Sequence, residues 1–129
     1  MEIDFEIPLN PIPLARPRFG LGRVFDSQKN EKESYRWFMI KAMVGKRKFI
    51  MPITLEVIFY MPIAIRRMSS TPDGEPHMYR PDLSNLVKFV EDAGLGILYD
   101  DDSVIARIDA RKVYRRIGGV RVKIKEGIE

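Results

Sequence analysis

The alternation of apolar and polar residues predicts three stretches of β-structure in this chain. Over residues 2–7, apolar side chains alternate with acidic ones, which is the two-residue period of a strand with one buried face. Residues 54–60 are rich in β-branched and aromatic types and lie between two prolines, which predicts a second strand. From residue 106 to 125, two alternating stretches flank a turn at 115–119, which predicts a β-hairpin with one strongly basic face.

A first helix is predicted between these strands by apolar residues at helical spacing. It begins at Asp26 or Ser27 and has Lys41 near its end, where the helix dipole favours a positive charge. Its apolar surface is wide, so we expect it either to be buried on two sides or to pack against a second copy of the chain. The residues that widen this surface beyond one stripe are Trp37, Ile40 and Val44.

A second helix is predicted after Pro81, which favours extended geometry at Arg80 and leaves Asp82 at the N-cap position. Gly94 and Gly96 end this helix. The order strand, helix, strand, helix, hairpin predicts an α+β fold, with a mixed β-sheet and two main helices in a single domain over 1–129. The apolar face of the second helix consists of Leu83, Leu86, Val87, Val90 and Ala93.

Three consecutive aspartates, Asp100, Asp101 and Asp102, stand directly before the third predicted strand. Adjacent carboxylates repel one another, so we expect a cation near them, and Mg²⁺ binds through carboxylate oxygens. Asp82 would complete such a site if the start of the second helix and the start of the strand meet in the fold. Alternatively, Asp82 only caps its helix, and the aspartates form a solvated turn.

Ten residues between 81 and 102 stand at the spacing of a known family signature. They are Pro81, Asp82, Asn85, Lys88, Asp92, Ala93, Gly96, Tyr99, Asp101 and Asp102. The segment resembles the signature of the RusA family of Holliday junction resolvases, which runs Pro-Asp-x-Asp-Asn-x-x-Lys, then Asp-Ala in a helix, Gly, an aromatic residue and Asp-Asp. The resemblance implies a RusA-like endodeoxyribonuclease that cuts four-way DNA junctions with Mg²⁺, as a homodimer with two symmetric acidic sites.

The resemblance also implies roles for these residues. Asp82, Asp101 and Asp102 would bind Mg²⁺, or Mn²⁺ in its place, and Lys88 would contact the scissile phosphate or stabilise the leaving oxygen. Lys88 alternatively forms a surface ion pair with Asp92. One departure matters, because Ser84 stands where the family has a second carboxylate, and a hydroxyl is a poorer metal ligand. The residues expected to support the site are Ser84, Asn85, Asp92 and Asp100.

That departure leaves two functions open. One is a resolvase that makes paired symmetric cuts in branched DNA during recombination and repair. The other is a family member with weak or no catalysis that acts as a branched-DNA-binding protein. A third class, a small interaction module without a nucleic-acid role, would show no steep loss of DNA affinity with salt.

The charge distribution agrees with a nucleic-acid partner. The net charge is +4 and the isoelectric point is about 9.4, with the basic residues in separate groups around the acidic segment. A basic rim binds phosphates while an acidic centre holds metal, although a basic surface with an unrelated acidic turn would have the same composition. The residues expected to contact DNA are Arg16, Arg18, Arg23, Lys46, Arg47, Lys48, Arg66, Arg67, His77 and Arg80.

Turn residues in series predict a mobile loop at about 63–79, placed as a lid over the site. His77 in this loop either contacts a phosphate or a metal-bound water, or is incidental. The chain has no cysteine and one histidine, so any metal must be held by oxygen. No apolar stretch approaches the roughly 18–20 residues that span a bilayer, and the acidic N-terminus is unlike a signal peptide. We therefore expect a cytoplasmic protein without a membrane partner, of bacterial or phage origin as the family suggests.

Overall fold

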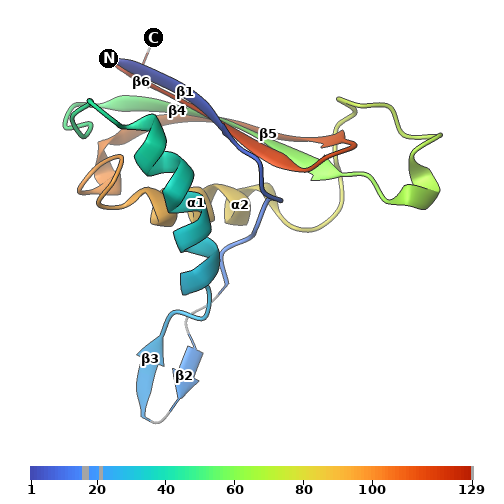
Figure 1. Cartoon of the computed structure of the whole chain (residues 1–129), viewed down its shortest axis with the longest axis horizontal. Helices are drawn as coiled ribbons and strands as arrows, with labels where there is room; N and C mark the ends of the chain where they lie inside the picture. The colour runs from blue at the N-terminus through green and yellow to red at the C-terminus, as the bar shows by residue number, and fades with distance from the viewer. Residues whose placement is uncertain (16–17, 21, 129) are drawn as a thin grey trace.

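A four-stranded mixed sheet forms one layer of the molecule (Figure 1). Its strands are β1 (Glu2–Ile7), β4 (Ile53–Pro62), β5 (Ile105–Arg115) and β6 (Gly119–Glu126), in the spatial order β1-β6-β4-β5. Both β1 and β4 pair antiparallel with β6, whereas β5 runs parallel to β4. The α+β fold class and the mixed sheet predicted from the sequence are confirmed. The computed structural model describes residues 1–15, 18–20 and 22–128.

Two helices, α1 (Lys29–Ala42) and α2 (Leu83–Gly94), form the second layer and cover one face of the sheet (Figure 1). Tyr35 of α1 and Phe89 of α2 are both fully buried, and their rings meet edge to face at a centroid distance of 5.0 Å. Full burial of an apolar side chain of this size stabilises the fold by about 1.5–3 kcal/mol. The contact therefore fixes α1 against α2 and holds α2 under the sheet.

The wide apolar surface of α1 is not buried on both sides in a single protomer. Met39 has no exposed surface, but Trp37, Ile40 and Val44 are 58%, 55% and 74% exposed. The expectation that this helix is buried on two sides is therefore wrong for the isolated chain. The covering elements, α2 and the sheet, contact only the face that carries Tyr35 and Met39.

The two C-terminal strands are present as predicted, but they do not form a hairpin. Each pairs with β4, which lies between them. Six of the ten residues of β4 are buried, so this strand lies in the centre of the sheet, whereas the more polar β5 lies at an edge. The connection spans two strand spacings, about 10 Å. The four Cα steps from Arg115 to Gly119 cover this distance, because each reaches up to about 3.8 Å.

Part of the segment between β1 and α1 forms a short antiparallel ribbon. Its strands are β2 (Arg18–Gly20) and β3 (Arg23–Phe25), and they point away from the sheet (Figure 1). The turn between them contains Gly22 with a φ of 76°, a conformation that glycine adopts without a steric penalty. Two 3₁₀ turns, η1 (Ile65–Arg67) and η2 (Asp102–Val104), complete the described elements.

Candidate active site

Asp82 stands at the N-cap position of α2, as the sequence predicts. Its backbone is extended, with φ −67° and ψ 139°, and its carbonyl accepts hydrogen bonds from the amides of Asn85 and Leu86 at 3.1 and 3.2 Å. Its carboxylate is exposed and accepts no capping hydrogen bond within the described part of the chain. Asp82 therefore starts the helix through its backbone, and its side-chain oxygens remain available to a ligand.

A groove runs along α2 between this helix and β5. Its polar wall is the ridge formed by Ser84, Lys88 and Glu91, and its volume is about 680 Å³. These residues follow at four- and three-residue steps, which places their side chains on one face of a helix. The remaining lining residues are apolar and are Leu83, Val87, Ile108 and Ala110. The groove therefore has a charged lip and an apolar floor.

The far end of this groove is acidic. Burial and the neighbouring carboxylates of Asp102 and Asp92 raise the pKa of Glu91, with burial the largest cause. Asp101 accepts a hydrogen bond from the amide of Ser103 at 2.9 Å, and this bond lowers its pKa. The sequence-based site did not include Glu91. Its seven-residue spacing from Ser84 along the polar ridge was the signal that could have identified it.

The structure does not bring Asp82 to Asp101 and Asp102 within one protomer. The helix runs antiparallel to β5, so its first residue lies beside Lys112 and its last turn lies beside the start of the strand. Asp102 lies near Glu91, and nine residues of helix separate Glu91 from Asp82, about 13 Å at 1.5 Å per residue. The expected meeting of the helix start and the strand start is thus not found in a single chain.

A single protomer accordingly does not fit the expected metal site. Among residues 1–15, 18–20 and 22–128, no three acidic or histidine side chains gather closely enough to hold a metal ion. Of the supporting residues, Asp100 pairs with Lys48 at 2.8 Å and Asp92 lies 3.7 Å from Lys32. These two carboxylates already have cations beside them, whereas Asp82, Glu91, Asp101 and Asp102 have no ion pair within the described residues.

Two further residues of the predicted site, Lys88 and Asn85, have contacts that differ from those expected from the sequence. Lys88 is exposed and forms no ion pair with Asp92 within the described chain, so the alternative role given to it is not seen. Asn85 connects α2 to the N-terminal segment, because its carbonyl accepts from the amide of Leu14 at 3.0 Å. That bond holds the segment before the β2–β3 ribbon against the first turn of α2.

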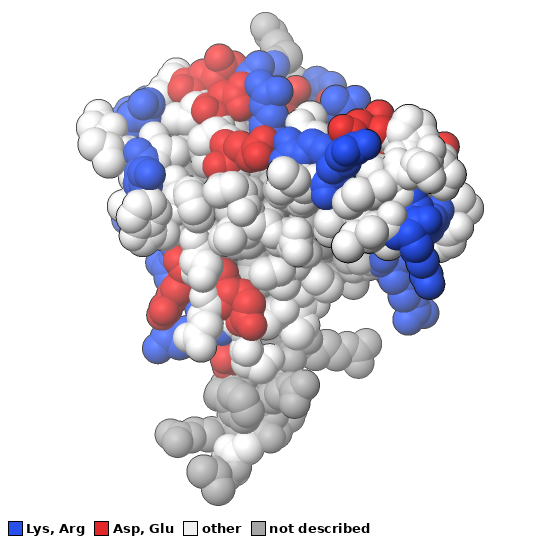
Figure 2. Space-filling model, turned by 45° about the vertical axis from the view of Figure 1, so that its right-hand side comes forward, with Lys and Arg blue, Asp and Glu red and all other residues white. Residues whose placement is uncertain are grey.

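The sheet face opposite the helices is close to electrically balanced. Arg121 of β6 forms two hydrogen bonds with Asp4 of β1, Arg115 bonds both oxygens of Glu6, and Lys123 lies 3.7 Å from Glu2. Figure 2 shows such acidic and basic groups side by side along the top of the molecule. The basic face predicted from β6 is therefore neutralised by the acidic residues of β1, which makes it a poor phosphate-binding surface.

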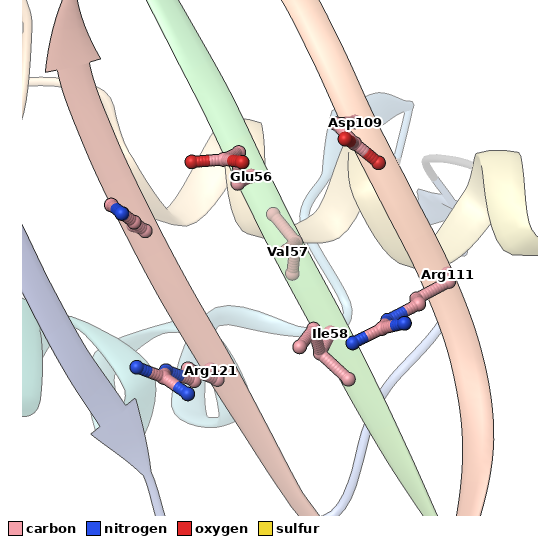
Figure 3. A pocket seen from close by; sticks show the side chains of 7 residues that line it. Glu56, Val57, Ile58, Asp109, Arg111 and Arg121 are labelled. Carbon is pink, nitrogen blue, oxygen red and sulfur yellow. The ribbon is translucent and has the colours of Figure 1, made fainter. Parts of the chain in front are cut away.

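A hollow of about 390 Å³ lies on this same outer face (Figure 3). Glu56 of β4 and Asp109 of β5 lie opposite each other, Arg111 lies farther along β5, and Arg121 extends from β6. One carboxylate oxygen of Glu56 is buried without a hydrogen-bond partner in the described chain. Because Arg111, Arg121 and Lys123 line the hollow together with these two carboxylates, its lining is mixed in charge and unlike an acidic metal site.

The residues predicted to contact DNA differ in exposure and in whether they already form ion pairs. Arg16 lies outside the described residues, and only the backbone is described for Arg18 and Arg23. Of the cluster after α1, Lys46 is exposed, while Arg47 pairs with Glu126 at 2.8 Å and Lys48 pairs with Asp100. The remaining residues belong to the segment between β4 and α2 and are Arg66, Arg67, His77 and Arg80.

Two of these residues, Arg67 and His77, have contacts around the segment that leads into Asp82. The guanidinium of Arg67 lies 5.8 Å from the ring centroids of both Tyr79 and Tyr114. Burial lowers the pKa of His77, and the positive charges of Lys112 and Arg67 lower it further. All three causes favour the neutral form of the imidazole. Backbone bonds join residues 74–77 of the predicted mobile loop to β5, and the mobility of the loop stays a prediction.

The sequence model of the endodeoxyribonuclease RusA family matches residues 8–125, nearly the whole chain. The chain belongs to the RusA family. The match covers both helices, the acidic run and most of the sheet, so endonuclease activity on branched DNA is the family function of this fold. A search of curated protein sequences finds no match to the chain. Within the described residues, no helix of this RusA-family protein is long and apolar enough to cross a membrane.

Proposed function

We propose that this RusA-family protein is a structure-specific endonuclease that resolves four-way DNA junctions. The observation that carries this proposal is the charged lip of the groove along α2. Asp82 lies at one end, Glu91 and Asp102 lie near the other, and Lys88 lies between them. Binding to DNA alone does not require carboxylates without ion-pair partners, because such groups repel phosphates.

A homodimer would bring the two acidic ends together. A two-fold axis near the middle of the groove would set α2 of one copy antiparallel to that of the other, so that Asp82 of one copy approaches Asp102 of the second. Two features support this surface as the interface. The groove floor is apolar, and Ile108 in it is 45% exposed. On the side of β5 that faces away from β4, residues 105–111 form no backbone hydrogen bonds within the described chain, so this sheet edge is free to pair.

Mg²⁺ dependence belongs to the same proposal, although within the described residues the carboxylates of one protomer alone do not gather closely enough to hold the ion. The ammonium of Lys88 stands on the groove wall one turn after Ser84, where a DNA backbone entering the groove would meet it. Arg66, Arg67 and Arg80 are exposed residues of the segment between β4 and α2 that leads into Asp82, and they would hold the flanking phosphates. The cytoplasmic location stays a prediction from sequence.

The decisive experiment compares a labelled four-way junction with a matched linear duplex, in Mg²⁺, in Mn²⁺ and with chelator. Wild-type protein should make paired nicks confined to the junction. Asp102→Asn should lower the cleavage rate by about 100-fold or more. Asp109→Asn makes the same charge change on the outer sheet face and should leave the rate within about threefold.

The alternative function is a branched-DNA-binding protein with weak or no catalysis. The observation that favours it is Ser84, which lines the groove where the family has a carboxylate. Tight junction binding without cleavage in either metal would establish this alternative and would contradict the resolvase proposal.

A further inference from the structure

Lys112 of β5 occupies an unusual position for a lysine. It lies opposite Phe59 of β4 on the helix-covered face of the sheet, and Phe59 is 1% exposed. Its side chain is only partly exposed, and within the described residues it forms no ion pair. A lysine in such a place covers apolar surface with its stem and directs its ammonium to polar groups at the edge of the core.

The polar groups that it reaches are two backbone carbonyls. The ammonium donates to the carbonyl of Tyr79 and to the carbonyl of Pro81, the second at 2.7 Å. The carbonyl of Lys112 itself accepts from the amide of His77 at 3.1 Å. One residue of the sheet therefore binds the segment before α2 at three positions, 77, 79 and 81.

This segment leads directly into the candidate active site. Pro81 precedes Asp82, whose carbonyl accepts the first two hydrogen bonds of α2. Fixing the carbonyl of Pro81 therefore fixes the backbone from which the Asp82 side chain extends. Asp82 needs such support from elsewhere, because its exposed carboxylate has no bond that would orient it within the described chain.

The electrostatic surroundings indicate why a charged group is retained here. Arg67 lies beside the same segment, and burial, followed by the charges of Lys112 and Arg67, disfavours protonated His77. Within the described residues no carboxylate pairs with the ammonium of Lys112, so its partial desolvation costs free energy that its bonds to the two carbonyls offset. Hydrogen bonds with an ionised donor are roughly twice as strong as neutral ones, which suits a positioning role.

We propose that Lys112 is a positioning residue, which holds the segment from Tyr79 to Pro81 against β5 and thereby sets the orientation of Asp82. The proposal deepens the endonuclease function and rests on it. Lys112 itself does not touch the reacting phosphate. Its effect is on the rate of cleavage in the bound complex and not on the affinity for the junction.

The test uses the full-length chain and three variants. Lys112→Met keeps the length of the stem and removes the ammonium, Lys112→Arg restores donors, and Lys123→Met removes a lysine from the outer sheet face as a control. Lys112→Met should lower kcat for junction cleavage by about 10-fold or more, because small misplacements of catalytic groups are costly. Its junction affinity, measured in chelator, should stay within about threefold.

A second measurement does not depend on activity. In Lys112→Met, amide hydrogen exchange at Asn85 and Leu86, the first bonded amides of α2, should become about 10-fold faster, while exchange in β4 stays unchanged. Lys112→Arg should recover part of both losses, and Lys123→Met should show neither. Thermal melting by circular dichroism confirms that each variant is folded at the assay temperature.

Two results would overturn the proposal. Unchanged exchange at Asn85 and Leu86 would show that Lys112 does not hold the start of α2. A weaker junction affinity with unchanged kcat at saturating junction would show that it contacts DNA instead. If wild-type protein cuts no junction, the endonuclease function fails by itself, and the exchange measurement still decides whether Lys112 fixes the segment.

Discussion

Ser84 lies in the first turn of α2, two residues after Asp82 and on the wall of the groove. Its hydroxyl is neutral, whereas the signature that the chain otherwise follows has a carboxylate there. The structure offers Glu91 at the other end of the same ridge, where burial and neighbouring acids raise its pKa. At the scale of single residues, the question is whether this different set of carboxylates is sufficient for cleavage.

Replacement of Ser84 by Asp answers that question. If the native site lacks one carboxylate, Ser84→Asp should raise the cleavage rate by about 10-fold or more. The folded state should tolerate the change, because a negative charge in the first turn of a helix is favoured by its dipole. Ser84→Asn is the control, because asparagine has nearly the size of aspartate but is neutral. Equal rates for wild type and Ser84→Asp would show that the carboxylates are supplied elsewhere.

At the scale of elements, the strongest constraint on the outer sheet face is the ladder between β1 and β6. Glu2, Asp4 and Glu6 lie directly opposite Lys125, Lys123 and Arg121, and the ion pairs of Arg121 with Asp4 and of Lys123 with Glu2 join diagonal positions of this ladder. Opposite charges at such cross-strand positions stabilise pairing and disfavour a shift in register. The ladder therefore joins the N-terminal strand to the C-terminal one.

The pH dependence of this ladder can be measured at Asp4. The hydrogen bonds from Arg121 lower the pKa of Asp4 below its usual 3.8. A lowered pKa means that the pair stabilises the fold above pH 3.8 and that this contribution is lost as the pH falls further. Asp4→Asn should therefore lower Tm slightly at pH 7, by about 1–3 °C, and the difference should shrink progressively as the pH is lowered below 3.8. A difference that stays constant over that acidic range would contradict this ion-pair account.

The sequence predicted the helices and strands of the fold better than their arrangement. Periodicity identified both helices, and Asp82 and Gly94 mark the bounds of α2 as expected. It could not show that β4 lies between β5 and β6, because pairing over such sequence distances leaves no local pattern. The same limit applied to the site. The signature placed Asp82 and Asp102 correctly along the chain, but only the antiparallel packing of α2 against β5 shows that a single protomer keeps them apart.

At the scale of the whole molecule, two apolar surfaces are candidates for the interface of the proposed dimer. One is the groove with Ile108, and the other is the exposed stripe of α1 with Trp37, Ile40 and Val44. A two-fold axis through the groove would place α2 of each copy beside the other. An axis through the α1 stripe would not pair the acidic ends of α2.

Oligomeric state distinguishes these surfaces. Ile108→Glu should convert a dimer to a monomer in analytical ultracentrifugation and should abolish paired cleavage, because it buries a charge at the proposed contact. Trp37→Ser on α1 is the matched change on the competing surface and should leave the dimer intact. A dimer lost by Trp37→Ser and kept by Ile108→Glu would move the interface to α1.

The ion pairs between β1 and β6 also affect how the protein responds to ionic strength. A cation that already has a carboxylate partner releases no additional counterion from DNA, so Arg115, Arg121 and Lys123 add little to the salt dependence of binding. The slope of log affinity against log salt should thus report mainly the cations that have no carboxylate partner. Raised salt would then weaken junction binding less steeply than the total of 22 lysines and arginines suggests.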